Sequence, residues 1–347
     1  MTQTPTALVI GATGSFGAHA TMALIKHGWS VRALARDPQG AARRFGERTP
    51  VDWRRGDAMD PASIVAAAEG VQALVHAANP PGYRNWGGLV APMVEGAIAG
   101  AMAAGARLVL PGTVYNYAPD AGPTITEDAP QAPTTRKGRI REAVERRLLQ
   151  ASADGLKVLI LRAGDFFGPA TPNGSFHWLV RVRGGRVGGV WAPGPQSVGH
   201  AFAYTPDLGE TLARLLARES ELAAFERFHF RGHWLPNGGD LARAIGRVSG
   251  QPGLRARPFP WIAVDLAAPF NETLRELREM RYLWRRPIGL DNERLVRFLG
   301  SEPHTPLDEA VATSLADMGL LAESASPSAA EVERPPSCYG PSAIAAR

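Results

Sequence analysis

The chain has 347 residues, of which 45% are hydrophobic and 20% are charged, with a formal net charge of +5. These proportions are typical of soluble globular proteins and exclude a wholly disordered or fibrous chain. No apolar run approaches the roughly 20 residues that a membrane helix needs. All but three of the 38 basic residues are arginines. They are scattered along the chain and form no single basic block, so we expect no nucleic-acid partner.

Cysteine content and the first residues bear on metal binding and location. Cys338 is the only cysteine, which excludes an intramolecular disulfide and a cysteine-based zinc site. The first residues lead almost directly into an apolar strand, without the charged segment and long apolar stretch of a secretory signal. We therefore expect a cytoplasmic protein with no metal and no membrane partner.

Hydrophobic periodicity predicts the fold class. From residue 6 to about 165, short β-branched apolar runs alternate with Ala-rich segments of helical period, which predicts an α/β fold with a doubly wound parallel sheet. The expected strands span 7–10, 31–35, 51–54, 73–76, 108–110 and 158–161. The expected helices between them span 16–28, 61–69, 91–104 and 136–153.

The composition changes after residue 168, where Pro- and Gly-rich stretches begin. We expect a first domain over 1–168, a smaller domain over 169–323 and a disordered Ser/Ala/Pro/Glu-rich tail over 324–347. An alternative to this division is that segments of the second part return to the first sheet. Helical periodicity recurs at 207–217, 240–249, 274–283 and 292–299.

A glycine-rich loop follows the first strand. The sequence Gly11-Ala-Thr13-Gly14-Ser15-Phe16-Gly17 lies between that strand and an amphipathic helix. The first glycine allows a tight turn, the second lets backbone N–H groups approach a pyrophosphate, and the third lets the helix pack closely on the strand. This context predicts a dinucleotide-binding loop.

The end of the second strand bears on the choice of dinucleotide. NAD-binding loops place a carboxylate there for the ribose hydroxyls, whereas this chain has Ala35 followed by Arg36. A guanidinium beside a small neutral residue can pair with a 2′-phosphate. We therefore expect NADP(H) as the cofactor.

These motifs resemble the extended short-chain dehydrogenase/reductase family, in its NAD-dependent epimerase/dehydratase branch. The resemblance implies a Rossmann-type domain over 1–168 that binds NADP and a substrate-binding lid over 169–323. It also implies further cofactor contacts in three elements, an adenine-contacting G-D motif, a fourth-strand motif and a loop beneath the nicotinamide. The residues concerned are Asp57 and Ala58, then Ala77 and Ala78, then Ala163 and Asp165.

The catalytic positions depart from the family pattern. In the family a Tyr exchanges a proton with the substrate, a Lys four residues later lowers the pKa of that Tyr, and a Ser orients the substrate. Aligned without gaps, the Tyr becomes Lys137 and the Lys becomes Arg141, while Pro111 takes the place of the Ser and Thr113 is the nearest hydroxyl. The chain is identified as an atypical member that lacks the Tyr-x-x-x-Lys pair.

Two interpretations of Lys137 stay open. It could serve as a general acid, with a pKa lowered by Arg141 and the nicotinamide ring. Alternatively, Lys137 and Arg141 lie one helical turn apart and only contact cofactor or solvent. Tyr117 is a weaker alternative acid, near the carboxyl edge of the sheet where ligands of such folds bind.

The substrate side is rich in aromatic residues. The family's phosphate-binding Arg is replaced by His200, which weakens the case for a nucleotide-sugar substrate. Two or three aromatic side chains are expected to line a pocket, from the set Phe166, Phe167, Phe176, Trp178, Trp191, Trp234 and Trp261. We predict an NADPH-dependent oxidoreductase that acts on a small, largely apolar carbonyl compound. The alternatives are an inactive NADP(H)-binding sensor and a sugar epimerase or dehydratase, and a homodimer through 91–104 and 136–153 is weakly favoured.

Overall fold

The computed structural model describes residues 4–46, 48–80 and 85–321. A seven-stranded sheet lies at its centre, and every neighbouring pair of its strands is parallel. In spatial order the strands are β12 (Phe225–His229), β7 (Lys157–Arg162), β5 (Arg107–Gly112), β4 (Ala73–His76), β1 (Thr6–Ile10), β2 (Ser30–Ala35) and β3 (Val51–Arg55). The strand order reverses beside β1, as in the Rossmann fold. The predicted fold class is confirmed.

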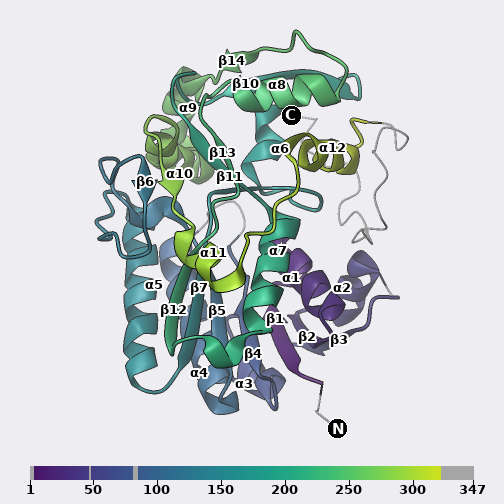
Figure 1. Cartoon of the computed structure of the whole chain (residues 1–347), viewed down its shortest axis with the longest axis vertical. Coiled ribbons are helices and arrows are strands. Elements are labelled where there is room, and N and C mark those ends of the chain that lie inside the picture. Colours follow the sequence, from purple (N-terminus) through teal and green to yellow (C-terminus); the bar gives the residue numbers. More distant parts are fainter. Residues whose placement is uncertain (1–3, 47, 81–84, 322–347) are drawn as a thin grey trace.

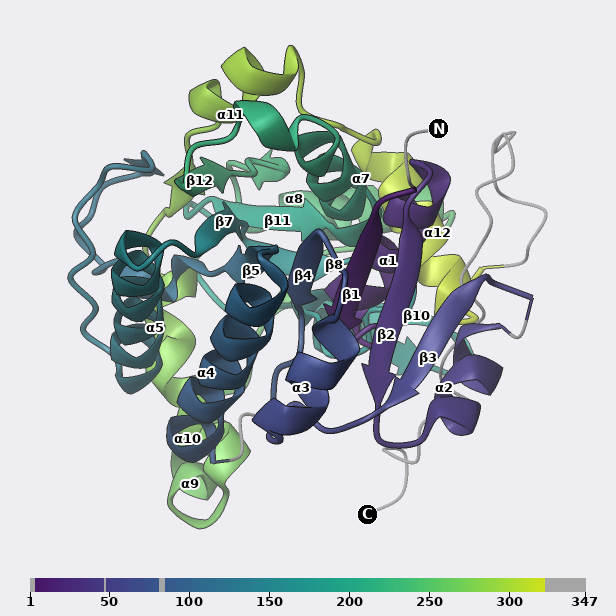
Figure 2. The same cartoon turned by 90° about the horizontal axis from the view of Figure 1, so that it is seen from below.

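Helices cover both faces of this sheet (Figure 2). Alternate strand residues face opposite layers, because successive side chains of a strand point to opposite faces. Val9 packs in the core shared with one layer, whereas Leu8 and Ile10 pack in the core shared with the other. The first layer contains α1 (Ser15–Lys26), α7 (Thr205–Leu216) and α11 (Glu293–Leu299), and the second contains α3 (Pro61–Ala68), α4 (Trp86–Ala104) and α5 (Arg136–Ala153).

Helix α4 corrects the expectation about apolar runs. It has 19 residues and is long and apolar enough, by length and composition alone, to cross a membrane. In the structure it lies between α3 and α5 against the sheet (Figure 2). Val94, Ala97 and Ile98 are buried in the core of that layer. A core helix therefore accounts for this apolar segment.

The second part of the chain, together with two short strands of the first part, forms three small sheets at one end of the large one (Figure 1). Five further helices accompany them, and three of these contribute side chains to a second core. The strands are β9 (Val180–Arg183) and β10 (Arg186–Ala192) with β14 (Ala256–Pro258), β8 (Asp165–Phe167) and β11 (His200–Tyr204) with β13 (His233–Leu235), and β6 (Thr124–Ile125) with β15 (Gly289–Leu290). The helices are α6 (Ser175–Leu179), α8 (Asp240–Val248), α9 (Trp261–Ala267), α10 (Glu272–Glu279) and α12 (Leu307–Asp317).

Two segments of this second part return to the large sheet. Strand β12 adds its seventh strand beside β7, and α7 packs on α1. The two parts of the chain therefore build the large sheet and its α1–α7 layer together. The predicted tail over 324–347 lies outside the described residues.

Several elements differ from the sequence expectation. Helix α2 (Pro38–Phe45) was not predicted, although Asp37 accepts a hydrogen bond from the backbone N–H of Gly40 and Pro38 suits a first helical turn. The helix expected over 91–104 begins earlier, at Trp86. The segment expected as one helix over 274–283 divides into α10 and the 3-10 helix η5 (Met280–Trp284). Neither α9 nor α12 was predicted.

Candidate functional site

The glycine-rich loop joins β1 to α1 through a turn that only glycine can make at two positions. Gly11 has a φ of +88°, and a Cβ there would lie 2.7 Å from the backbone nitrogen of Ala78. A Cβ on Gly17 would lie 2.1 Å from the carbonyl oxygen of Gly11. The N–H groups of the first turn of α1, which starts at Ser15 beside Gly14, have no carbonyl partner within the helix. This end of α1 therefore offers donors to an anion.

The element after β4 lies against that loop. The backbone N–H of Ala77 donates to the carbonyl of Ile10 over 2.8 Å, and Ala78 approaches Gly11 as described above. Phe16, at the start of α1, packs on Phe166 with ring centroids 6.3 Å apart. The structure thus brings Ala77 and Ala78 to the glycine loop, and places Phe166, the neighbour of Asp165, beside its helix.

Two arginines meet at the ends of β2 and β3. Ala35 is paired with Arg55 in the sheet register. The Arg55 guanidinium donates to the carbonyl of Arg36 over 3.2 Å, and both residues are exposed. Asp57 follows in the next turn, where its carboxylate accepts the N–H of Met59 over 2.9 Å. The sequence pattern gave Arg55 no role of its own. Its place beside Arg36 depends on the pairing of β2 with β3, which the sequence does not reveal.

Lys137 lies in the first turn of α5 and is fully buried. Its Nζ is 3.2 Å from Glu276 Oε2 and donates to the Glu276 carbonyl over 3.2 Å. Arg136 donates to the same carboxylate. Burial lowers the pKa of Lys137 to about 8, and the attraction of Glu276 opposes that shift. The predicted direction agrees, but the cause is burial and not Arg141.

Arg141 and Thr113 have other neighbours. The Arg141 guanidinium lies 4.9 Å from the centroid of the Trp86 ring, and one of its nitrogens is 3.4 Å from Asn79 Oδ1. The Thr113 hydroxyl donates to Asn116 Oδ1 over 3.1 Å. Each of the three expected catalytic residues is therefore engaged with a different part of the chain.

A buried polar network lies beneath this edge of the sheet. Arg162, at the end of β7, donates to both carboxylate oxygens of Glu145 on α5, over 2.8 and 2.7 Å. Asn116 and Gln131 donate to the same carboxylate over 2.9 and 2.6 Å. The side chains of Arg162 and Glu145 are 1% and 5% exposed. The network fixes α5 to β7, and sequence analysis assigned no role to either charged residue.

Tyr117 belongs to this network and not to an open site. Its side chain is fully buried, and the Arg162 guanidinium lies 5.1 Å from its ring centroid. Its hydroxyl is 3.5 Å from His229 Nε2. Burial raises the pKa of Tyr117. These contacts give Tyr117 a packing role.

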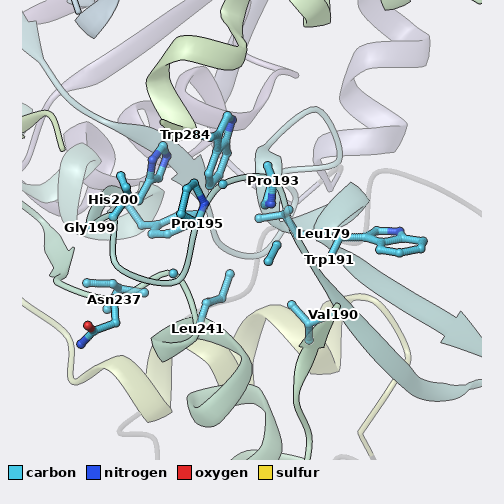
Figure 3. Close-up of a pocket in the computed structure, with 16 residues that line it drawn as sticks. Leu179, Val190, Trp191, Pro193, Pro195, Gly199, His200, Asn237, Leu241 and Trp284 are labelled. Carbon is cyan, nitrogen blue, oxygen red and sulfur yellow. The ribbon is translucent and has the colours of Figure 1, made fainter. Parts of the chain in front are cut away.

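An aromatic pocket lies on the substrate side (Figure 3). Its cavity is small, about 30 Å³, and is lined by segments from β10, β11, α8 and η5. Of the aromatic residues expected to line a pocket, only Trp191 does so, together with Trp284 and Phe202. The others pack elsewhere, as Phe166 does on Phe16, because residue type alone does not set the direction of a side chain.

His200 is the titratable side chain in the wall of this pocket. Its Nε2 is 2.9 Å from Asp165 Oδ2, and its ring is stacked on Trp284 with centroids 3.7 Å apart and planes within 6°. Sequence analysis named Asp165 as a cofactor neighbour and His200 as a departure from the family, but missed their pairing. The pairing depends on the contact of β8 with β11.

Comparisons with known proteins agree with this architecture. A model of the NAD dependent epimerase/dehydratase family matches residues 7–224, more than half of the chain. The "3-diazoavenalumate denitrifying reductase" of a Streptomyces species is 32% identical over 180 residues, which cover 47% of this chain and 57% of that protein. The chain thus spans little more than half of that relative.

Solved structures share the fold over most of the chain. The UDP-glucose 4-epimerase of Bifidobacterium longum, in complex with NAD⁺ and UDP, has a TM-score of 0.70 and 15% identity, and covers 89% of this chain and 97% of its own. A dTDP-glucose 4,6-dehydratase from Streptomyces venezuelae has a TM-score of 0.69 and 19% identity, with 90% and 96% covered. These likenesses show the fold alone. With the family match, the conclusion is that the chain belongs to the NAD-dependent epimerase/dehydratase family.

Proposed function

We propose that the protein is an NADPH-dependent reductase of a small, largely apolar carbonyl-type compound. The observation that carries this proposal is the intact glycine loop. Gly11 has no room for a Cβ beside Ala78, and Gly17 has no room for one beside the Gly11 carbonyl oxygen. The glycine loop Gly11 to Gly17, with Thr13, Ser15 and Phe16, would hold the pyrophosphate. Asp57 and Ala58 would contact the adenine, and Ala77, Ala78, Ala163 and Asp165 would line the nicotinamide end.

NADP is favoured over NAD by the charges at the ends of β2 and β3. Arg36 and Arg55 lie side by side, and no carboxylate occupies the position of Ala35. Two guanidinium groups can bind a 2′-phosphate through charge-assisted hydrogen bonds. The nearby carboxylate of Asp37 is engaged in capping α2. The solved neighbour from Bifidobacterium longum holds NAD⁺, so this preference distinguishes the present chain.

Reduction is favoured over epimerisation by the residue at the family's tyrosine position. Lys137 offers no phenol, and its ammonium is paired with Glu276. Oxidation of a sugar alcohol requires a base at this position, whereas a reductase requires only a proton donor. The Streptomyces relative carries the word reductase in its name. The nicotinamide supplies hydride to the substrate when it is bound.

This chain's own residues would position the substrate around that hydride. Thr113 and Arg141 would orient the polar group, and Lys137 remains a proposed acid, with Glu276 beside its ammonium. The pocket around Trp191 would hold an apolar or aromatic group, because its lining is largely apolar. The small-molecule substrate and a cytoplasmic location are part of the same proposal, as are the domain limits at residues 168 and 323.

Deuterium transfer tests the proposal directly. NADPH deuterated at nicotinamide C4 is incubated with the protein and a cell-extract metabolite pool, and products are analysed by mass spectrometry. Label above the no-enzyme background establishes a reductase and identifies its product. Arg36→Ala is expected to weaken NADPH binding about 10- to 100-fold with NADH binding unchanged. Arg43→Ala, which changes an exposed arginine of α2, serves as the control.

A non-catalytic NADP(H) sensor is the second candidate. The observation that favours it is the Lys137–Glu276 ion pair at the position where relatives carry their tyrosine. The same experiment decides between the two. Demonstrated NADPH binding without label in any product would favour the sensor, and label exchanged within a nucleotide sugar would favour the epimerase.

A further inference from the structure

We propose that His200, oriented by Asp165 and stacked on Trp284, donates the proton that completes the reduction. This inference rests on the proposed function, since it concerns the same substrate site. It names His200 as the proton donor in place of Lys137, because Lys137 is fully buried and paired with Glu276.

The ring of His200 is held on three sides. Asp165 Oδ2 lies 2.9 Å from Nε2, Trp284 is stacked on one face, and the Phe202 ring meets it edge-on with centroids 4.9 Å apart. The side chains of His200 and Asp165 are only 12% and 20% exposed. A fixed ring plane with a carboxylate at one nitrogen is the arrangement that orients a histidine for proton transfer.

The pair also joins the two parts of the site. Asp165 begins three residues after the end of β7, at the carboxyl edge of the sheet, and the next residue, Phe166, contacts Phe16 of the glycine-loop helix. His200 lines the aromatic pocket. The start of β8 and strand β11 approach each other closely, because a Cβ on Gly164 would lie 2.3 Å from the Ala201 carbonyl oxygen. His200 thus stands between the nucleotide edge and the pocket.

The other ring nitrogen, Nδ1, is available for the substrate. Within residues 4–46, 48–80 and 85–321, the hydrogen bond to Asp165 is the one contact that involves a ring nitrogen of His200. A histidine whose role was purely structural would be expected to use both nitrogens when it is this enclosed. Lys137, by contrast, is fully buried and directed at Glu276.

The proposed step balances as follows. Hydride adds with its electron pair to the carbonyl carbon, the C=O π bond breaks, and that electron pair moves onto oxygen. The N–H bond of the protonated His200 ring breaks, and its proton forms the O–H bond of the alcohol. Asp165 holds the ring in place through its hydrogen bond at Nε2, and solvent restores the proton afterwards. The nicotinamide leaves oxidised and the substrate leaves reduced.

The test compares His200→Ala and His200→Phe with wild type, using the substrate identified by the deuterium-transfer experiment. We expect kcat to fall about 10²- to 10⁴-fold in both variants, with KM and NADPH affinity changed less than about threefold. Added imidazole should restore part of the activity of His200→Ala, whose cavity beside Trp284 can admit it. It should not rescue His200→Phe, in which the new ring fills that space.

Asp165→Asn tests the orientation of the ring, and should lower kcat less than loss of the histidine does. It should also alter the step in the pH–rate profile that His200→Phe abolishes. A structural role alone would leave that profile unchanged and give no imidazole rescue. Wild-type activity retained in His200→Phe would overturn the inference while the reductase stands. If wild type transfers no deuterium to any product, the proposed function fails, and this inference fails with it.

Discussion

The nucleotide side and the substrate side of this site are built in different ways. On the nucleotide side, backbone meets backbone, since Gly11 lies against Ala77 and Ala78, and Gly17 lies against the carbonyl of Gly11. On the substrate side, side chains make the contacts, as in the stack of His200 on Trp284. A backbone cradle tolerates almost no substitution, whereas a side-chain pocket can be rebuilt one residue at a time. Chemistry can therefore change on one side while nucleotide binding is kept on the other.

The largest effect on NADPH affinity is expected where the backbone cradle is crowded. In Gly17→Val the new Cβ would lie 2.1 Å from the Gly11 carbonyl oxygen, so that α1 must move away from the loop. Overpacking of this kind costs roughly 3 kcal/mol of stability, and a displaced α1 no longer presents its N–H groups to the pyrophosphate, so we expect NADPH affinity to fall about 100-fold. Isothermal titration calorimetry with NADPH measures this change.

Gly253→Ala is the matched control, because a Cβ there meets nothing within 4 Å. We expect its NADPH affinity and its thermal midpoint to equal those of wild type. Normal affinity in Gly17→Val would show that the loop is not the pyrophosphate site, and the contrast between the two sides would then lose its basis.

The next prediction concerns stability, and it tests the buried network of Arg162 and Glu145 beneath the site. Glu145→Gln leaves the Arg162 guanidinium buried without its anion, and breaking a buried pair from one side costs about 3–5 kcal/mol. Urea denaturation followed by circular dichroism measures the loss. Glu95→Gln breaks an exposed pair with Arg147, in which the side chains are 50% and 38% exposed, and should cost at most about 1 kcal/mol. Equal losses in the two variants would contradict a structural network beneath the site.

The two sides also differed in how far the sequence predicted them. The strand-loop-helix context of Gly11 to Gly17 is contiguous, so local pattern and spacing suffice to place it. The edge where Arg36 meets Arg55 was half predicted, because the second residue is brought there by β2–β3 pairing. The substrate wall depends on contacts such as Asp165 with His200, and Lys137 with Glu276 across 139 residues. Neither periodicity nor motif spacing carries information about such pairs.

The buried Lys137 predicts how the stability of the protein depends on pH. Burial lowers the pKa of Lys137 to about 8, against the ordinary 10.5 of an unfolded lysine. The native state therefore releases this proton first, and the unfolded state binds more protons between these values. This contribution to stability consequently rises as the pH rises through that window.

We therefore compare the free energy of unfolding of wild type and Lys137→Met at pH 7.5 and 9.5. Relative to the variant, wild type should gain about 2 kcal/mol between these values. Lys26→Met changes a lysine that is 73% exposed and should follow wild type at both pH values. Parallel curves for wild type and Lys137→Met would mean that the ammonium is not desolvated in solution.

The smallest effect is expected where the C-terminal part of the described chain is joined to the nucleotide layer. Helix α7 begins at Thr205, and the carboxylate of Asp207 in its first turn accepts both the N–H and the hydroxyl of Thr305 over 2.7 Å. Thr305→Val removes the hydroxyl bond and keeps the N–H bond, so we expect a loss of about 1 kcal/mol, measured by urea denaturation. A loss of several kcal/mol in Thr305→Val would mean that this single junction, and not the shared cores, holds the two sides together.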